Sequence, residues 1–150
     1  MTFVLIGIAV VALWLAVIDA RTQRIPNRIV LPSTLIGAVL LATFSLGIAG
    51  QAILAAAISF AVLLVLNLVS RGQLGMGDVK LAALLGLGLG AIGWGYWLLG
   101  LSLGFVFGGV GATVLLARSR GRVGLKSYFA YGPYLVAGAL VAGALAYLKF

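Results

Sequence analysis

Long apolar segments alternate with short polar or glycine-containing breaks along the whole chain. A membrane-spanning helix needs roughly 20 apolar residues, and six segments fit: about 2–18, 29–48, 52–69, 79–97, 99–117 and 129–148. Their apolar residues run continuously, whereas the strands of a membrane barrel alternate apolar and polar residues. The pattern therefore predicts an all-α polytopic membrane protein, with residues 1–150 forming a single domain of six transmembrane helices.

The break between the fourth and fifth segments falls in the stretch GAIGWGYWLLG. This stretch fits a turn at the membrane surface, with Trp94, Tyr96 and Trp97 as interfacial anchors. The two segments beside it are rich in glycine, as expected for helices that approach each other closely.

The composition supports placement in lipid. The chain is 64% hydrophobic and 8% charged, whereas a soluble domain has about 25% charged residues. It has no cysteine and no histidine, which excludes disulfides, thiolate nucleophiles, imidazole bases and the usual zinc sites. We expect no metal and no cofactor. The start MTFVLIGIAV lacks a basic n-region, so it is predicted to be a retained helix rather than a cleaved signal peptide.

Basic residues gather on one side of the predicted bundle. They lie in or beside the first, third and fifth breaks, and only Lys149 falls on the other side. They are Arg21, Arg24, Arg28, Arg71, Lys80, Arg118, Arg120, Arg122 and Lys126. Because cytoplasmic loops carry an excess of Lys and Arg, this side is predicted to be cytoplasmic and both termini to lie outside. Short basic clusters at helix ends fit contact with anionic lipid head groups, so nucleic-acid binding is not expected.

The chain has only two carboxylate side chains, Asp19 and Asp78. Asp19 ends the first segment and Asp78 opens the fourth, so both are predicted at the same membrane face. Asp78 fits a structural role as an N-cap. Asp19 fits one less well, because a negative charge at a helix C-terminus costs about 0.3–1 kcal/mol. Ionisable residues close to hydrocarbon are candidates for function.

Together the two acids predict a specific chemistry. Two carboxylates a few ångströms apart do not both ionise easily, so the pair holds a proton. One acid can then take a proton from water while the other polarises a peptide carbonyl. Gly75 and Gly77 precede Asp78; lacking Cβ atoms, they would let a substrate backbone approach and permit an unusual backbone turn.

Three stretches resemble the type IV prepilin peptidase family of membrane aspartic proteases. DARTQRIPN resembles the first family motif, GMGDVK resembles the Gly-x-Gly-Asp-x-Lys motif, and YGPYLVAGAL resembles the Gly-Pro segment that opens the last helix. The matching residues are Asp19, Ile25, Pro26, Asn27, Gly75, Gly77, Asp78, Lys80, Gly132 and Pro133.

The resemblance implies that Asp19 and Asp78 form the catalytic pair of an aspartic endopeptidase. The family cuts the short basic leader from type IV prepilin-like precursors at the cytoplasmic face of the cell's inner membrane. Longer bacterial members carry cysteine pairs linked to N-methylation of the new amino terminus. This sequence has no cysteine and resembles the short members, such as those serving Flp/Tad-type pili, so no methyltransferase activity is expected.

The other matching residues have structural and functional interpretations. Pro26 would hold its loop extended, and Asn27 would either cap the second helix or position the loop near Asp19. Lys80 would extend to the membrane surface, or else bias the acid pair or bind substrate. Gly132 and Pro133 would start the last helix beside the substrate.

Three rival functions remain open from the sequence. A small ion-coupled transporter would use the two acids as a relay, but it would place them mid-membrane on interrupted helices. A protease with a Ser70–Lys80 pair would leave the acids idle. A purely structural membrane subunit would leave the Gly-x-Gly-Asp sequence unexplained.

Overall fold

The computed structural model describes residues 1–22, 27–70, 74–118 and 131–148. This part of the chain contains six α-helices and no strand, which confirms the predicted all-α bundle. The helices are α1 (Thr2–Thr22), α2 (Asn27–Phe44), α3 (Leu46–Val69), α4 (Met76–Ile92), α5 (Trp94–Arg118) and α6 (Gly132–Leu148).

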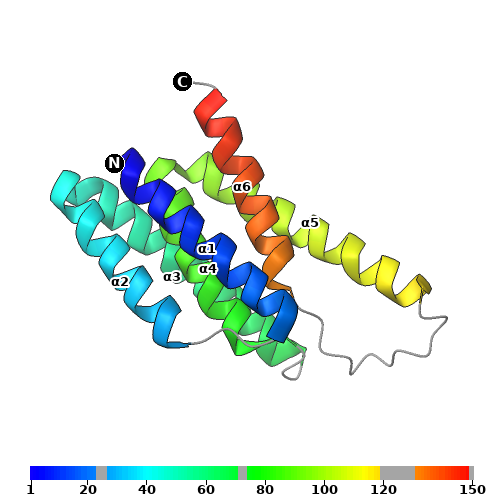
Figure 1. Cartoon of the computed structure of the whole chain (residues 1–150). Coiled ribbons are helices and arrows are strands. Elements are labelled where there is room, and N and C mark those ends of the chain that lie inside the picture. The colour runs from blue at the N-terminus through cyan, green and yellow to red at the C-terminus, as the bar shows by residue number, and fades with distance from the viewer. Residues whose placement is uncertain (23–26, 71–73, 119–130, 149–150) are drawn as a thin grey trace.

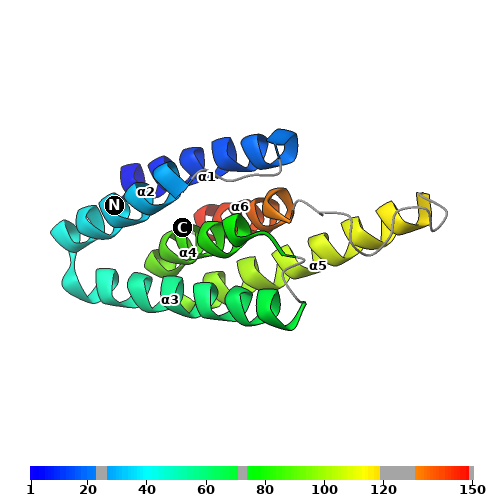
Figure 2. The same ribbon diagram turned by 90° about the horizontal axis from the view of Figure 1, so that it is seen from below.

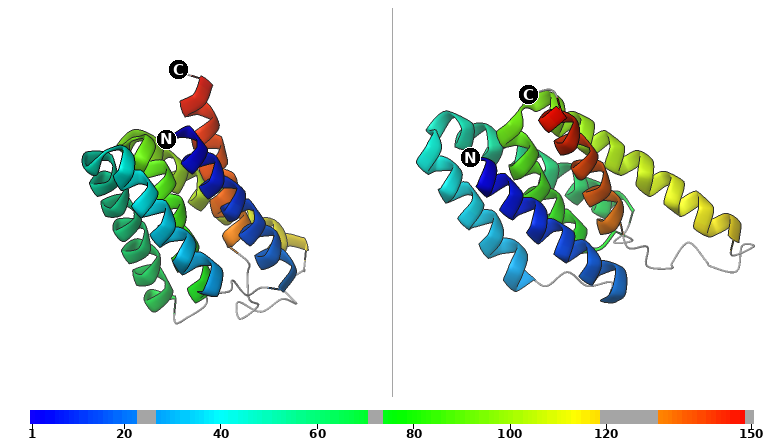
Figure 3. Two further views of the ribbon diagram at one scale, coloured as in Figure 1. Left: turned by 60° about the vertical axis from the view of Figure 1, so that its left-hand side comes forward. Right: turned by 45° about the horizontal axis from the view of Figure 1, so that its top comes forward.

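The helices run up and down, so successive helices point in opposite directions (Figure 1). Seen from below, α1 and α2 form one layer, α4 and α6 a middle layer, and α3 and α5 a third (Figure 2). Helix α4 contacts each of the other five helices. The C-terminal half of α5 extends beyond the other helices (Figures 1 and 2, and Figure 3, right). The ends of α1, α3 and α5 therefore lie with the starts of α2, α4 and α6 at one end.

The outer surface of the bundle is apolar. Large side chains such as Phe3, Leu35 and Leu68 are mostly exposed, which a bilayer would cover. By length and composition, three described helices can cross a membrane, over the ranges Thr2–Asp19, Leu46–Val69 and Trp94–Val114. The apolar helices Arg28–Phe44 and Gly132–Leu148 are shorter. The surface and these lengths indicate a membrane protein.

Missing side chains let α4 pack closely against α3. A Cβ atom added to Gly86 would lie 2.8 Å from the Ala55 carbonyl oxygen and 3.0 Å from Ala56 Cα. The same is true one turn later, where a Cβ on Gly90 would lie 3.1 Å from Ala52 Cα. The glycine-rich fourth segment thus makes the close helix contact expected from the sequence.

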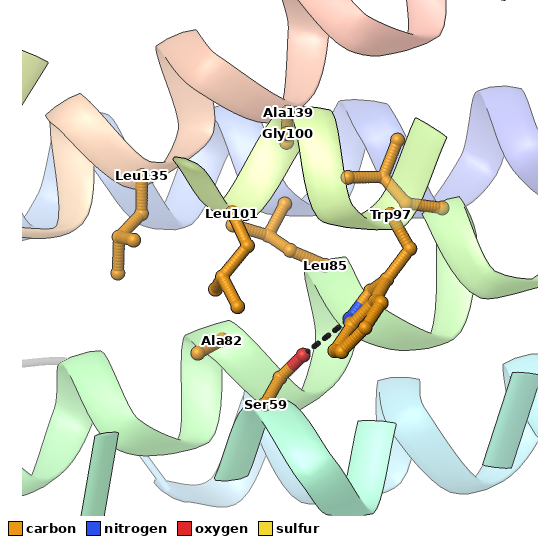
Figure 4. Close-up of a pocket in the computed structure, with 10 residues that line it drawn as sticks. Ser59, Ala82, Leu85, Trp97, Gly100, Leu101, Leu135 and Ala139 are labelled. Atoms are coloured by element: carbon orange, nitrogen blue, oxygen red, sulfur yellow. Dashed lines mark hydrogen bonds between the residues drawn. The ribbon is translucent and has the colours of Figure 1, made fainter. Parts of the chain in front are cut away.

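An internal pocket between α3, α4, α5 and α6 holds a buried polar pair (Figure 4). The Trp97 indole Nε1–H donates to Ser59 Oγ at 2.8 Å, and the Ser59 hydroxyl donates to the Ala55 carbonyl at 2.8 Å. Trp97 is buried. The expectation of Trp97 as a surface anchor is therefore wrong, because its N–H finds a protein acceptor inside the bundle.

Two breaks between helices differ from the predicted positions. Phe44 ends α2 and α3 begins at Leu46, so a single residue, Ser45, separates them, and its side chain accepts a hydrogen bond from the Ile48 N–H at 3.4 Å. The predicted break at 49–51 is helical. Helix α4 ends before Gly93, whose φ of 156° favours glycine. This turn lies within the stretch GAIGWGYWLLG, as predicted, but before the expected break at residue 98. Continuous apolar character hid the turn at Ser45.

Candidate active site

Asp19 lies in the last turn of α1, on the face that packs into the bundle. Its side chain is only 4% exposed, although α1 ends at Thr22. Leu15 and Ala16, one turn earlier, are buried as well. The Asp19 carboxylate therefore lies on the inward face of α1, at the edge of the core, and not on the surface of the bundle.

Asp78 lies in the first turn of α4 and is 3% exposed. The N-cap of this helix is Gly75, with φ −66° and ψ 137°, and the Asp78 N–H donates to the Gly75 carbonyl at 3.0 Å. Asp78 is thus not the N-cap that the structural interpretation of the sequence required. Its carboxylate still gains from the positive end of the α4 dipole.

The two carboxyl groups meet in front of Gly132, the first residue of α6. A Cβ atom built on Gly132 would lie 2.7 Å from Asp19 Oδ2 and 3.2 Å from Asp78 Oδ1. Both oxygens are buried, and neither has a hydrogen-bond partner within the described part of the chain. Three helix ends, far apart in sequence, thus bring two unsatisfied carboxyl oxygens to one point.

Backbone amides at the start of α6 face this acid pair. The Gly132 amide interacts with both carboxyl groups, and the amides of Tyr131 and Gly75 interact with Asp78. The carboxyl groups are also close enough for the charge of Asp19 to act on Asp78. A helix N-terminus carries about half a positive charge. It therefore favours one shared negative charge on the pair.

Tyr131 is a further residue of this site, and the sequence analysis did not select it. Its hydroxyl group donates to the Phe105 carbonyl at 3.4 Å, and its ring lies where a Cβ on Gly108 would be. Its ring also packs against Phe105, with centroids 6.2 Å apart. Its position directly before Gly132 was the available signal. Tyr131 thus connects α5 to the start of α6.

The remaining predicted site residues have mixed outcomes. Gly75 has an ordinary extended conformation and Gly77 lies within α4, so the unusual backbone turn expected at these glycines is wrong. Lys80 is half-buried in α4, two residues beyond Asp78. Pro133 occupies the second position of α6, where a helix needs no N–H donor.

Two predicted site residues lie at or beyond the limit of the described residues. Pro26 lies outside the described residues, as does the side chain of Asn27, although Asn27 is the first residue of α2. Their expected contacts with the first loop therefore stay predictions.

Asn67, at the end of α3, is buried, and its amide donates to Met76 Sδ at 3.1 Å. It joins α3 to α4 as an interhelical hydrogen-bond partner.

Comparison with known proteins gives one match. The model of the type IV leader peptidase family matches residues 6–148, which include both acids and the start of α6. No curated protein and no solved structure matches the chain. The match spans nearly the whole bundle and agrees with the motifs that carry the site. The chain belongs to the type IV leader peptidase family.

Proposed function

We propose that the protein is an aspartic endopeptidase in which Asp19 and Asp78 cleave the basic leader from type IV prepilin-like precursors. The observation that carries this proposal is the convergence of Asp19 Oδ2 and Asp78 Oδ1 on Gly132. Membership of the leader peptidase family supports the peptidase activity and the class of substrate. No metal or cofactor takes part.

The acid pair performs the proton transfers of peptide hydrolysis. Two carboxyl groups this close hold one proton between them. The ionised acid takes a proton from water, whose oxygen attacks the carbonyl carbon, while the protonated acid gives its proton to the carbonyl oxygen. The tetrahedral intermediate then collapses as a proton moves to the amide nitrogen and the C–N bond breaks. The products are a carboxylic acid and an amine.

The substrate reaches the acids in an extended conformation. In a helix each carbonyl accepts a hydrogen bond from within the helix, which shields it from attack. The acids lie at one end of the bundle, so the apolar segment of the precursor lies in the bilayer beside the helices. Its leader lies along the membrane surface.

The charges support a cytoplasmic position for the site. Arg21, in the last turn of α1, Arg28, at the start of α2, and Lys80, near the start of α4, lie at the same end of the bundle as the acids. By the positive-inside rule this end faces the cytoplasm and both termini lie outside. Anionic lipid head groups attract the same residues. We do not expect N-methylation of the product.

The ion-coupled transporter is the weaker alternative. A transporter needs polar groups that continue from the acids through the membrane. Besides the two acids, the described core contains Ser59 and Asn67 as buried polar residues. Ser59 bonds within its own helix and to Trp97, and Asn67 bonds to Met76. These bonds are local and do not extend the acid pair into a path.

The test uses purified protein in detergent and a prepilin-like substrate. Asp19→Asn and Asp78→Asn each keep the shape of the side chain but remove its acid–base chemistry. Each is expected to lower cleavage by at least about 1,000-fold, while thermal unfolding shows a folded protein. Gly143→Ala serves as a control, because a Cβ there meets no atom within 4 Å. Full cleavage by either Asn variant would reject the proposed dyad.

A further inference from the structure

We propose that Gly132 is a positioning residue of the acid pair, because its missing side chain leaves the space in which water and the scissile carbonyl meet both carboxyl groups. This inference rests on the proposed peptidase function. Gly132 would thus act beside the two acids, from the start of α6.

The space in question is defined by three distances. An added Cβ at residue 132 would lie 2.7 Å from Asp19 Oδ2 and 3.3 Å from Asp19 Cγ, and 3.2 Å from Asp78 Oδ1. All three are shorter than ordinary van der Waals contact. A methyl group here would therefore push Asp19 away from Asp78, or occupy the room between them. Gly132 is itself buried, so the new group has no open side to turn toward.

The two carboxyl oxygens beside this space are the ones that lack partners. Asp19 and Asp78 are 4% and 3% exposed, yet Asp19 Oδ2 and Asp78 Oδ1 make no hydrogen bond within the described residues. A buried oxygen without a partner is unfavourable. Since both oxygens turn toward Gly132, the place where a water would satisfy them is the place that a side chain would fill.

The backbone of Gly132 has a second role. Its amide interacts with both carboxyl groups, and Pro133, which follows, has no N–H to offer. Gly132 therefore supplies from one residue both the amide that holds the shared charge and the room for the reacting atoms. A larger residue would keep the amide and lose the room, which makes the two roles separable by experiment.

The first experiment compares Gly132→Ala with Gly143→Ala in steady-state cleavage of a prepilin-like substrate in detergent. Gly143 lies in the same helix, and a Cβ there meets no atom within 4 Å. Gly132→Ala is expected to lower kcat by about 100-fold, as misplacement by about 1 Å does, with KM changed by less than about two-fold. Gly143→Ala is expected to keep the wild-type kcat. A wild-type kcat for Gly132→Ala would overturn the proposal, as would an equal loss in both variants.

The second experiment tests the contact without using activity. Thermal unfolding is measured for the wild type, Gly132→Ala, Asp19→Ala and the double variant. The crowding is mainly with Asp19, so Gly132→Ala is expected to lower the unfolding midpoint of the wild type but not that of Asp19→Ala. The double variant is expected to fold even if Gly132→Ala alone does not. An equal drop in both backgrounds would overturn the proposal.

These experiments also separate this inference from the proposed function. If the Asn variants of the two acids cleaved normally, the peptidase mechanism would fail, whereas the unfolding cycle would still measure the contact between Gly132 and Asp19. If the Asn variants are inactive and Gly132→Ala is fully active, the dyad stands and the role of Gly132 falls.

Discussion

Two buried polar clusters in the same bundle differ in how well their hydrogen bonds are satisfied. In the middle of the bundle, the Trp97 indole donates to Ser59, and Ser59 donates to the Ala55 carbonyl. At one end, Asp19 and Asp78 are equally buried, but one oxygen of each has no partner in the described chain. Buried polar groups in native proteins are normally paired. The satisfied cluster stabilises the bundle, whereas the unsatisfied one, on the proposed function, is available to bind a substrate.

Removing one acid should give the largest contrast between the effect on cleavage and the effect on stability. Asp78→Ala is expected to lower cleavage by at least about 1,000-fold. It is expected to change the free energy of unfolding by no more than about 1 kcal/mol, because removal of an unpaired buried oxygen offsets the loss of the amide interactions. Denaturant unfolding and cleavage are measured on the same preparation. A loss of several kcal/mol in stability would show that the acids hold the fold together.

A change in helix packing should lower stability and leave cleavage intact, the opposite of removing an acid. A side chain at Gly86 would lie against Ser59 Oγ and the backbone of α3, at 2.8 Å from the Ala55 carbonyl. Backbone atoms cannot yield as a flexible side chain does, so Gly86→Val is expected to cost about 3 kcal/mol of unfolding free energy. Cleavage per folded molecule should stay near wild type. Gly50→Val, in open space on α3, is the control, and an equal cost there would contradict the close-packing argument.

Loss of the Trp97–Ser59 hydrogen bond should cost less stability than the packing change at Gly86. Ser59→Ala leaves the buried indole N–H without its acceptor, at a cost of about 2 kcal/mol. Trp97→Phe removes the donor as well, so the double variant should be less destabilised than the sum of the two single variants. Unfolding of the four proteins measures this coupling. Strict additivity would mean that the bond makes no net contribution.

The smallest expected effect comes from the contact between Tyr131 and α5. A methyl group at Gly108 would displace the Tyr131 ring and with it the start of α6. Gly108→Ala is expected to lower kcat by about tenfold through this shift. The neighbouring Gly109→Ala meets no atom within 4 Å and should have no effect. If both variants cleave alike, Tyr131 does not control the position of Gly132.

The sequence located the paired acids because carboxylates are rare in this chain. In a chain with two carboxylates, Asp19 and Asp78 stand out at once, and the Gly-Pro pair marks the start of α6. The apolar runs likewise predicted six helices. The tight turn at Ser45 was missed because its flanking residues are as apolar as the helices. Trp97 was misjudged because an aromatic residue suits both the membrane interface and the core, and only its acceptor, Ser59, decides between them.

The place of Gly132 in the last helix has a consequence for biosynthesis. A ribosome that has completed α5 has already made both acids, but the segment that completes their surroundings is still missing. On the proposed function, the acid pair becomes competent for proteolysis only when α6 packs against α1 and α4, so the nascent chain could not cut before this helix is in place.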